Sequence, residues 1–224
     1  MSFFDRPWWE LPLFVIDFEG SSTSGIVEYG VVEILGSKIV NCTTKLCRPR
    51  HPISFHETYQ HQHQLKPQVL AKAISFDQEK DCWIAWRNRG LFVAHHAPVE
   101  KNFLKQYWPY PPAVPNFLQE GNVIQWGPWI DTLRIFQNCF PQLDSYQLID
   151  LIKIFQLEKE LVILSEKYCP KNRMAPHCAL YDALATNLLL KYLGKLQGFA
   201  NMTLGWLNRL SQPSNINDQD EFSW

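Results

Sequence analysis

An uninterrupted apolar run at residues 13–16 leads directly into two acids, Asp17 and Glu19. The run lies between Pro12 and Gly20, and this pattern is typical of a strand that is buried on both faces. Because side chains alternate along a strand, the two acids point to the same side. Neighbouring carboxylates at the end of a buried strand repel each other and resist desolvation. We therefore expect a divalent cation to be bound between them.

The next segments alternate apolar and polar residues with a period of two. Residues 26–35 and 38–47 are predicted strands, and Gly36-Ser37 between them fits a two-residue hairpin turn with glycine in the first position. The loop at 20–25 contains only glycine, serine and threonine, so we expect it to be polar and flexible. The sheet is thus predicted to begin with antiparallel strands.

Further along the chain the apolar positions follow helical spacing. A short apolar strand at 91–94 precedes a helix that starts near Pro98 and carries an apolar stripe from Val99 to Tyr107. The same patterns predict helices at 78–89, 132–140, 146–155, 177–193 and 201–210, a helix or loop at 158–168, and a strand within 122–131. Strands that alternate with helices predict an α/β fold, with a mixed central sheet flanked by helices.

Composition narrows the class of protein. Hydrophobic residues make up 46% and charged residues 19% of the 224 residues, as in a globular domain. We assign one domain to residues 11–210, with a lead-in at 1–10 and a mobile tail at 211–224. The net charge of −1 provides no global basic field, so a polyanion would have to be held by a local patch and by metals.

Segments that direct a protein to membranes or to secretion are not found in the sequence. No apolar run approaches the ~20 residues of a membrane span, and the first residues resemble no secretory signal, so we expect a cytoplasmic protein that does not bind membranes. The six scattered cysteines are then expected to be reduced. Cys42 and Cys47 match no standard zinc spacing, although histidines lie nearby.

Three more polar residues lie where they could meet the first strand. Glu100 falls in the first turn of the helix after the 91–94 strand. His177 and Asp182 stand at the start of the last long helix. Two positions five apart in a straight helix point ~140° apart, so both reach one cleft more easily if His177 sits at the helix entry, just after Pro176, and Asp182 sits one turn in. Each residue alone also fits an ordinary role at a helix start or on a solvated helix face.

Taken together, these segments resemble a known family. Asp17-Phe18-Glu19, the sequence AHHAPVE at 94–100 and HCALYDA at 177–183 resemble the three exonuclease motifs of the DnaQ-like (DEDDh) 3′→5′ exonucleases. Segments 129–133 and 145–151 also resemble the family, and the likeness covers roughly residues 11–193. It implies a ribonuclease H-like fold. Two residues depart from the family pattern: Glu100 replaces the usual aspartate, giving a DEEDh variant, and His96 replaces the usual asparagine.

The resemblance implies a metal-dependent phosphodiesterase that releases nucleoside 5′-monophosphates from DNA 3′ ends. Asp17, Glu19, Glu100 and Asp182 would hold two Mg²⁺ or Mn²⁺ ions, which in such sites lie about 4 Å apart. His177 would be the general base, because imidazole has an ordinary pKa of ~6.5. Glutamate at position 100 leaves the choice between Mg²⁺ and Mn²⁺ open. The substrate-binding residues implied are Phe18, Gly20, Ser21, Ser22, Ile26, His96, Tyr146 and Arg173. Among these, Ile26 and Tyr146 would stack on or wedge the last bases, and Arg173, in a basic loop, would hold the phosphate backbone.

Several alternatives remain open at the level of sequence. The motifs do not separate a deoxyribonuclease from a 3′→5′ exoribonuclease, because contacts to the 2′-hydroxyl lie in loops. A catalytically decayed binding module would have to retain four site residues without using them. Repair, proofreading, end-trimming and nucleic-acid turnover are equally compatible with the motifs. A protein partner, including a second copy of the chain, is also compatible with them.

Overall fold

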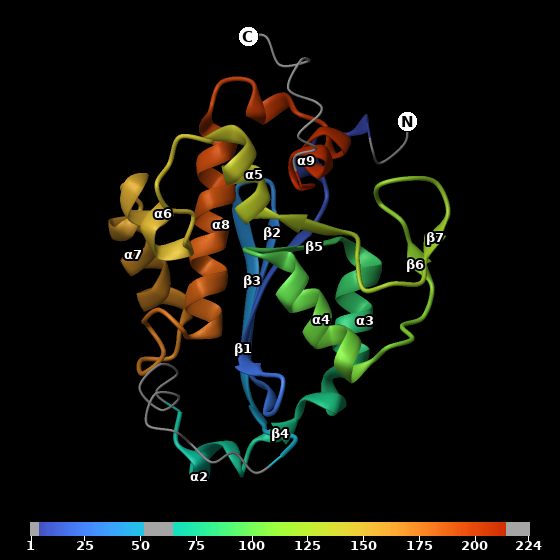
Figure 1. The fold of residues 1–224 in the computed structure, drawn as a ribbon, viewed down its shortest axis with the longest axis vertical. Helices are drawn as coiled ribbons and strands as arrows, with labels where there is room; N and C mark the ends of the chain where they lie inside the picture. Colours follow the sequence, from blue (N-terminus) through green and yellow to red (C-terminus); the bar gives the residue numbers. More distant parts are fainter. Residues whose placement is uncertain (1–4, 52–64, 214–224) are drawn as a thin grey trace.

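The computed structural model describes residues 5–51 and 65–213, and a mixed β-sheet crosses the molecule (Figure 1). Its strand order is β4-β3-β2-β1-β5-β8. The bounds are β1 (Leu13–Ser21), β2 (Gly25–Leu35), β3 (Lys38–Arg48), β4 (Ile74–Ser75), β5 (Leu91–Ala94) and β8 (Trp129–Asp131). Strands β1, β2 and β3 pair antiparallel, whereas β5 pairs parallel with both β1 and β8. The α/β fold class with antiparallel first strands is therefore confirmed.

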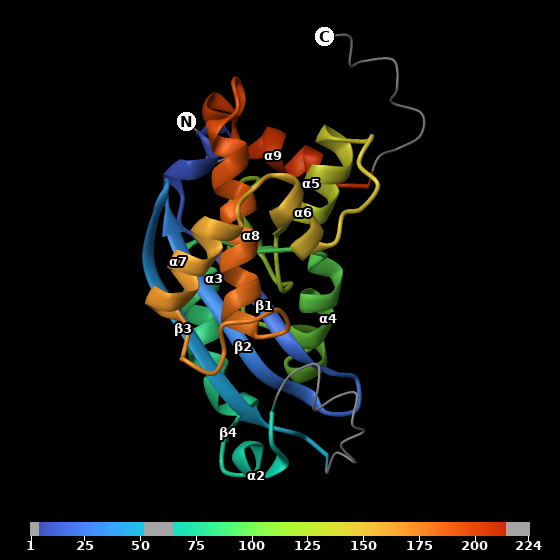
Figure 2. The same cartoon turned by 90° about the vertical axis from the view of Figure 1, so that its left-hand side faces the viewer.

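Helices cover both faces of this sheet. Figures 1 and 2 show α8 along one face, with α6 and α7 beside it, and α3 and α4 on the other face. The helix bounds are α2 (Pro67–Leu70), α3 (Lys80–Arg89), α4 (Ala97–Tyr107), α5 (Thr132–Cys139), α6 (Leu148–Ile154), α7 (Glu158–Tyr168), α8 (Ala179–Lys195) and α9 (Leu204–Leu210). Short 3-10 turns are η2 (Trp8–Glu10), η3 (Phe76–Glu79) and η4 (Phe199–Asn201), and β6 (Val114–Pro115) pairs with β7 (Asn122–Val123) in a small separate sheet.

Strand β1 divides two hydrophobic cores because its side chains alternate. Leu13 and Val15 belong to the aliphatic core under α8. Phe14, Ile16 and Phe18 belong to an aromatic core under α3 and α4. Asp17 and Glu19 continue the odd-numbered series, so they lie on the α8 face. The sequence had predicted this shared side correctly.

Two local predictions need correction. The 20–25 loop is shorter than expected, because β1 and β2 extend to Ser21 and Gly25. The Ser21 and Ser24 side chains each accept a hydrogen bond from the other residue's backbone N–H, at 2.9 and 3.0 Å. In α4, Val99 is 40% exposed, and Glu100 lies on the buried face instead. An acid therefore replaces an apolar residue in the stripe of that helix.

The two ends of the described chain meet at one edge of the domain. The Trp8 indole donates to the Phe199 carbonyl at 3.1 Å, and the Leu204 backbone N–H donates to the Arg6 carbonyl at 2.9 Å. The assignment of domain bounds at 11–210 stays a prediction, and most of the tail assigned to 211–224 lies outside the described residues. Among the helices of the described part, none has the length and apolarity needed to cross a membrane.

Candidate active site

The start of α8 is pressed against the sheet beside the two acids of β1. Gly30 on β2 lies opposite Asp17 in the antiparallel ladder. A Cβ on Gly30 would lie only 2.4 Å from the backbone of Ala179 and Leu180. Only glycine therefore lets the first turn of α8 approach this closely. The contact brings Asp182, one turn into α8, toward the carboxyl end of β1.

The sequence predicts a helix from residue 177, but α8 begins at Ala179, so His177 lies before it, in a left-handed backbone conformation with φ of 64°. A non-glycine residue adopts this conformation at a cost, which surrounding contacts have to offset. Here the His177 backbone N–H donates to Asp182 Oδ2 at 2.9 Å. The imidazole itself is exposed. One carboxylate thus fixes the backbone of the histidine while remaining part of the acidic cluster.

Glu100 reaches the site from the other face of the sheet. It is buried in the first turn of α4 and accepts a hydrogen bond from the Phe18 backbone, between the two acids of β1. His96, just before α4, is also left-handed, with φ of 75°, and its backbone N–H donates to Asp131 Oδ1 at 3.0 Å. Both helices that carry a predicted site acid therefore begin after a strained histidine.

These elements place oxygen and nitrogen ligands close together. One ligand atom from each of Glu19, His177 and Asp182 lies within 4.8 Å of the others. Two carboxylate oxygens of the site, Asp182 Oδ1 and Glu100 Oε2, are buried and accept no hydrogen bond from the described residues. Buried polar atoms normally have a partner. The donor set and the two unsatisfied oxygens fit a hard divalent cation.

Three carboxylates of the site, those of Asp17, Glu100 and Asp182, also resist ionisation. Burial raises the pKa of Asp17 well above its usual range, and the negative charges of Asp182, Glu100 and Glu19 raise it further. Burial and then Glu19 raise the pKa of Glu100 in the same direction. The pKa of Asp182 rises from 3.8 to about 8, first through burial and then through Glu19. A cation among these groups would favour their charged forms.

The predicted substrate residues are divided between the surface and the interior. Gly20 and Ser21 are partly exposed, and Ser22 and His96 are exposed. Tyr146 is half-buried, and its hydroxyl donates to the Phe140 carbonyl at 2.6 Å. These positions leave contacts with a nucleic acid possible only for the exposed part of the set.

Three of the predicted substrate residues are buried, which corrects the roles expected for Ile26 and Arg173. The Phe18 and Ile26 side chains are buried in the aromatic core, and Ile26 is fully inaccessible, so neither side chain can stack on a base. Arg173 is 4% exposed and forms an ion pair with Glu28. Its guanidinium is therefore not available for a phosphate. The physical reason is that an acid on β2 provides a closer, buried partner.

Sequence reasoning missed two residues that shape the site. Glu28 was treated as an ordinary strand residue, although a carboxylate within the run IVEYG at 26–30 is unusual for a buried strand. Tyr107 was assigned only to the core. Its hydroxyl accepts a hydrogen bond from the Ile26 backbone N–H at 3.0 Å and thereby holds the end of the 20–25 loop. No sequence signal points to this second contact.

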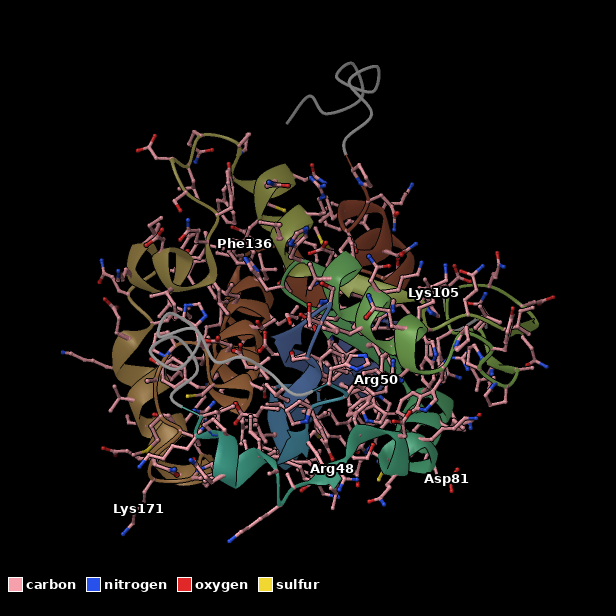
Figure 3. All side chains as sticks on the ribbon, turned by 60° about the horizontal axis from the view of Figure 1, so that its bottom comes forward. Arg48, Arg50, Asp81, Lys105, Phe136 and Lys171 are labelled. Carbon is pink, nitrogen blue, oxygen red and sulfur yellow. The ribbon has the colours of Figure 1, made fainter. Side chains whose placement is uncertain are left out.

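Figure 3 views the end of the molecule at which the site lies, with exposed basic side chains on both sides. Lys171, in the loop between α7 and α8, lies at one side, and Arg50 and Lys105 lie at the other. The Arg50 guanidinium covers the Tyr107 ring at 3.5 Å. These residues provide local positive charge on a chain whose net charge is −1.

Comparison with known proteins shows similarity in three-dimensional structure. No protein-family model and no curated protein sequence matches the chain. Exonuclease X in complex with 5′ overhanging duplex DNA is similar with a TM-score of 0.59 and 23% identity, over 89% of this chain and 99% of that chain. The nuclease domain of 3′hExo, a DEDDh family member bound to rAMP, gives a TM-score of 0.53 and 14% identity over 81% and 90%.

A third similar structure is larger than this protein. Exonuclease I from E. coli in complex with a dT13 oligonucleotide gives a TM-score of 0.53 and 11% identity, over 84% of this chain and 42% of that chain. The similar structures are ribonuclease H-like exonucleases. The ribonuclease H-like fold expected from the motifs is therefore confirmed.

Proposed function

We propose that this protein is a metal-dependent 3′→5′ exonuclease that removes nucleotides from DNA 3′ ends and releases nucleoside 5′-monophosphates. The observation that carries the proposal is the acidic cluster beside His177. Two buried carboxylate oxygens there accept no hydrogen bond from the described part of the chain. Such oxygens can coordinate the cations that neutralise the charge of a phosphodiester during its hydrolysis. The nucleic-acid complexes among the similar structures support the same class of substrate.

Asp17, Glu19, Glu100 and Asp182 are the residues that would hold two Mg²⁺ or Mn²⁺ ions. When bound, these ions stabilise the negative charge that develops on the phosphoryl group and make a water more acidic. The negative charges of Asp182, Glu100 and Glu19 all raise the pKa of Asp17, and a bound cation would favour its charged form. Asp17 would therefore help to hold the ions.

His177 is proposed as the general base. Its exposed imidazole takes the proton from the attacking water at a ring nitrogen, a role that histidine commonly has in general acid–base catalysis. The hydrogen bond from its backbone to Asp182 keeps the ring beside the cluster. The base and one metal-binding acid are therefore mechanically linked.

The terminal nucleotide is proposed to lie along the short loop after β1. Gly20, Ser21 and Ser22 offer backbone and hydroxyl groups, and His96 adds an exposed imidazole on the other side. The loop is braced by the Ser21–Ser24 hydrogen bonds and by Tyr107. A braced loop loses little conformational entropy when it binds a substrate.

A digestion assay with 5′-labelled single-stranded DNA tests this function. We expect a ladder that shortens from the 3′ end, a requirement for Mg²⁺ or Mn²⁺, and loss of activity with EDTA. Asp17→Ala should abolish cleavage, whereas Asn172→Ala, an exposed change outside the cluster, should not. Full activity in Asp17→Ala, or activity that survives chelation, would refute the metal assignment.

A second candidate is trimming of RNA 3′ ends. One similar nuclease is bound to rAMP, and another similar structure is a 3′-exonuclease that recognises a histone mRNA stem-loop. Matched DNA and RNA oligonucleotides digested side by side decide between the two substrates. A protein partner, a homodimer and a cytoplasmic location stay predictions of the sequence.

A further inference from the structure

Glu28 is a buried acid that the proposed chemistry does not use. It lies directly opposite Glu19 in the β1–β2 ladder and is only 1% exposed. Opposed like charges in a sheet destabilise it, and a buried charge needs a partner. Glu28 therefore has a structural cost at this position unless something nearby balances it.

Arg173 provides that balance through a two-point contact. Its Nε donates to Glu28 Oε1 at 3.1 Å, and its Nη2 donates to Glu28 Oε2. Such fork-shaped pairs fix orientation as well as charge. The backbone N–H of Ala179, the first residue of α8, also donates to Glu28 Oε2, at 3.3 Å. One carboxylate thus holds both the loop before α8 and the helix start.

The contact extends to the residue that carries the proposed base. Arg173 Nη2 also donates to the His177 carbonyl at 3.4 Å. The His177 backbone N–H is held by Asp182 at 2.9 Å. Both polar groups of the His177 backbone are therefore restrained, and this residue is one of the few with a left-handed backbone in the described chain.

We propose that Glu28 and Arg173 form a clamp that positions His177 for catalysis, acting as positioning residues that do not touch the substrate. The inference rests on the proposed function, because it assigns a purpose to the orientation of the proposed base. The clamp joins β2, the loop at 169–178 and the first turn of α8. It sets the distance between the imidazole and the acids of β1.

Single substitutions in the clamp, made first in the wild type and then in His177→Ala, form a double-mutant cycle that tests it. Arg173→Lys keeps the positive charge beside Glu28 but loses the fork that reaches two acceptors. We expect kcat to fall ~10–100-fold, as for small misplacements of catalytic groups, with KM unchanged. Glu28→Gln, which keeps the shape and an acceptor for Ala179, should give the same split. Asn172→Ala, in the same loop, is the control that should leave both constants unchanged.

The His177→Ala background separates positioning from general damage. Once the base is removed, Arg173→Lys should lower kcat by no more than about twofold, because coupled residues are not additive. An equal fall in both backgrounds would overturn the clamp, since it would show that Arg173 acts without His177. Glu28→Gln gives the same comparison if Arg173→Lys does not fold.

A spectroscopic measurement keeps this test independent of activity. In protein with ¹³C-labelled histidine, Arg173→Lys should shift or broaden the His177 ring signal, identified by its loss in His177→Ala. The ring signal of His95, which is bonded to Thr132 and Tyr146, should stay in place. Absence of nuclease activity in the wild type would refute the proposed function, whereas an unchanged His177 signal in Arg173→Lys would refute the clamp.

Discussion

The starts of α4 and α8 are built alike and differ in what they hold. Each follows a left-handed histidine whose backbone N–H donates to a carboxylate: His96 to Asp131 at 3.0 Å, and His177 to Asp182 at 2.9 Å. Asp131 lies on another element and also accepts from the Leu133 N–H at the start of α5. Asp182 lies in the same segment as its histidine and belongs to the acidic cluster. The His96–Asp131 hydrogen bond connects the ends of β5 and β8, whereas the His177–Asp182 hydrogen bond connects the proposed base to an acid of the site.

The difference indicates how one local geometry can support two tasks. The start of α4 contributes only Glu100 to the site, whereas His96 turns the backbone into the helix and has an exposed ring. At α8, both Asp182 and His177 are delivered, and a buried ion pair restrains the loop between them and α7. We therefore expect changes at the α8 start to affect chemistry more strongly than equivalent changes at the α4 start.

Matched amide substitutions should show the largest contrast. Asp182→Asn keeps an oxygen that can accept from the His177 N–H but removes a charge from the cluster. Since metal ions supply several kcal/mol of charge stabilisation in such reactions, turnover should fall on the order of 10³-fold or more. Asp131→Asn keeps its acceptor as well and should change kcat by less than about threefold, because a cap of this kind contributes mainly stability.

Steady-state digestion and calorimetric Mn²⁺ titration measure this contrast. Asp182→Asn should weaken Mn²⁺ binding, and Asp131→Asn should not. Equal losses in the two variants would mean that Asp182 serves only as a backbone acceptor, like Asp131. The starts of α4 and α8 would then have the same structural role and no difference in chemistry.

The residues of β1 and of the α8 start show which features of the site the sequence can predict and which it cannot. Asp17 and Glu19 were predicted correctly to share a face, because strand periodicity is local. His177 was expected at the start of a helix over 177–193, directly after Pro176. The helix begins two residues later, at Ala179, so only the approximate position of His177 could be predicted. Arg173 was expected to contact the phosphate backbone. Its partner in the structure is Glu28, which lies 145 positions away in the sequence, so no local pattern indicates the pairing. Such a contact follows from the packing of α8 on Gly30, which has no local signature.

Ile26 illustrates a second limit of sequence reasoning. A single apolar residue after a glycine-rich loop looks the same whether it points outward to a base or inward. Its direction is set by the register of β2 against β1, which shifts between Glu19 and Gly20. A one-residue change in register moves each side chain to the opposite face of the sheet. The sequence could therefore predict the strand but not the orientation of Ile26.

Removal of the two imidazoles should give the next largest contrast. His177→Ala removes the proposed base and should lower kcat about 100-fold, near the lower end for general acid–base catalysis, with DNA binding retained. His96→Ala removes only a possible substrate contact and should lower kcat less than about tenfold. Single-turnover cleavage and a fluorescence binding assay in Ca²⁺ separate turnover from affinity. Loss of binding in His177→Ala would contradict the assignment of a base.

The acid at the α8 start should also make stability depend on pH. Without metal, the pKa of Asp182 is raised from 3.8 to about 8, so the folded protein keeps a proton that the unfolded chain releases. The stability from this group is fully present below about pH 4 and is lost as pH rises through about 8. For one such group, the free energy of unfolding should fall by ~1.4 kcal/mol per pH unit within that window.

Urea unfolding in EDTA at pH 5 to 8 measures this slope. Asp182→Asn should make the slope shallower, because its amide does not titrate. Addition of Mn²⁺ at the upper end of the range should restore stability, since a ligand that binds only the folded state stabilises it. A metal-free protein that becomes more stable across this range would show that the cluster is already neutralised.

The length of Glu100 should have the smallest effect, because the α4 start supplies a single carboxylate. Glu100→Asp keeps the charge but draws the carboxylate back from the position of Oε2, the atom that accepts no hydrogen bond from the described residues. The Mn²⁺ concentration for half-maximal activity should rise about tenfold, comparable with the loss of a group that supports a metal site. At saturating Mn²⁺, kcat should be nearly unchanged. Val99→Ala, on the exposed side of the same turn, is the matched control. Tighter Mn²⁺ binding by Glu100→Asp than by the wild type would contradict this prediction. It would show that the shorter side chain places the carboxylate better for the metal than Glu100 does.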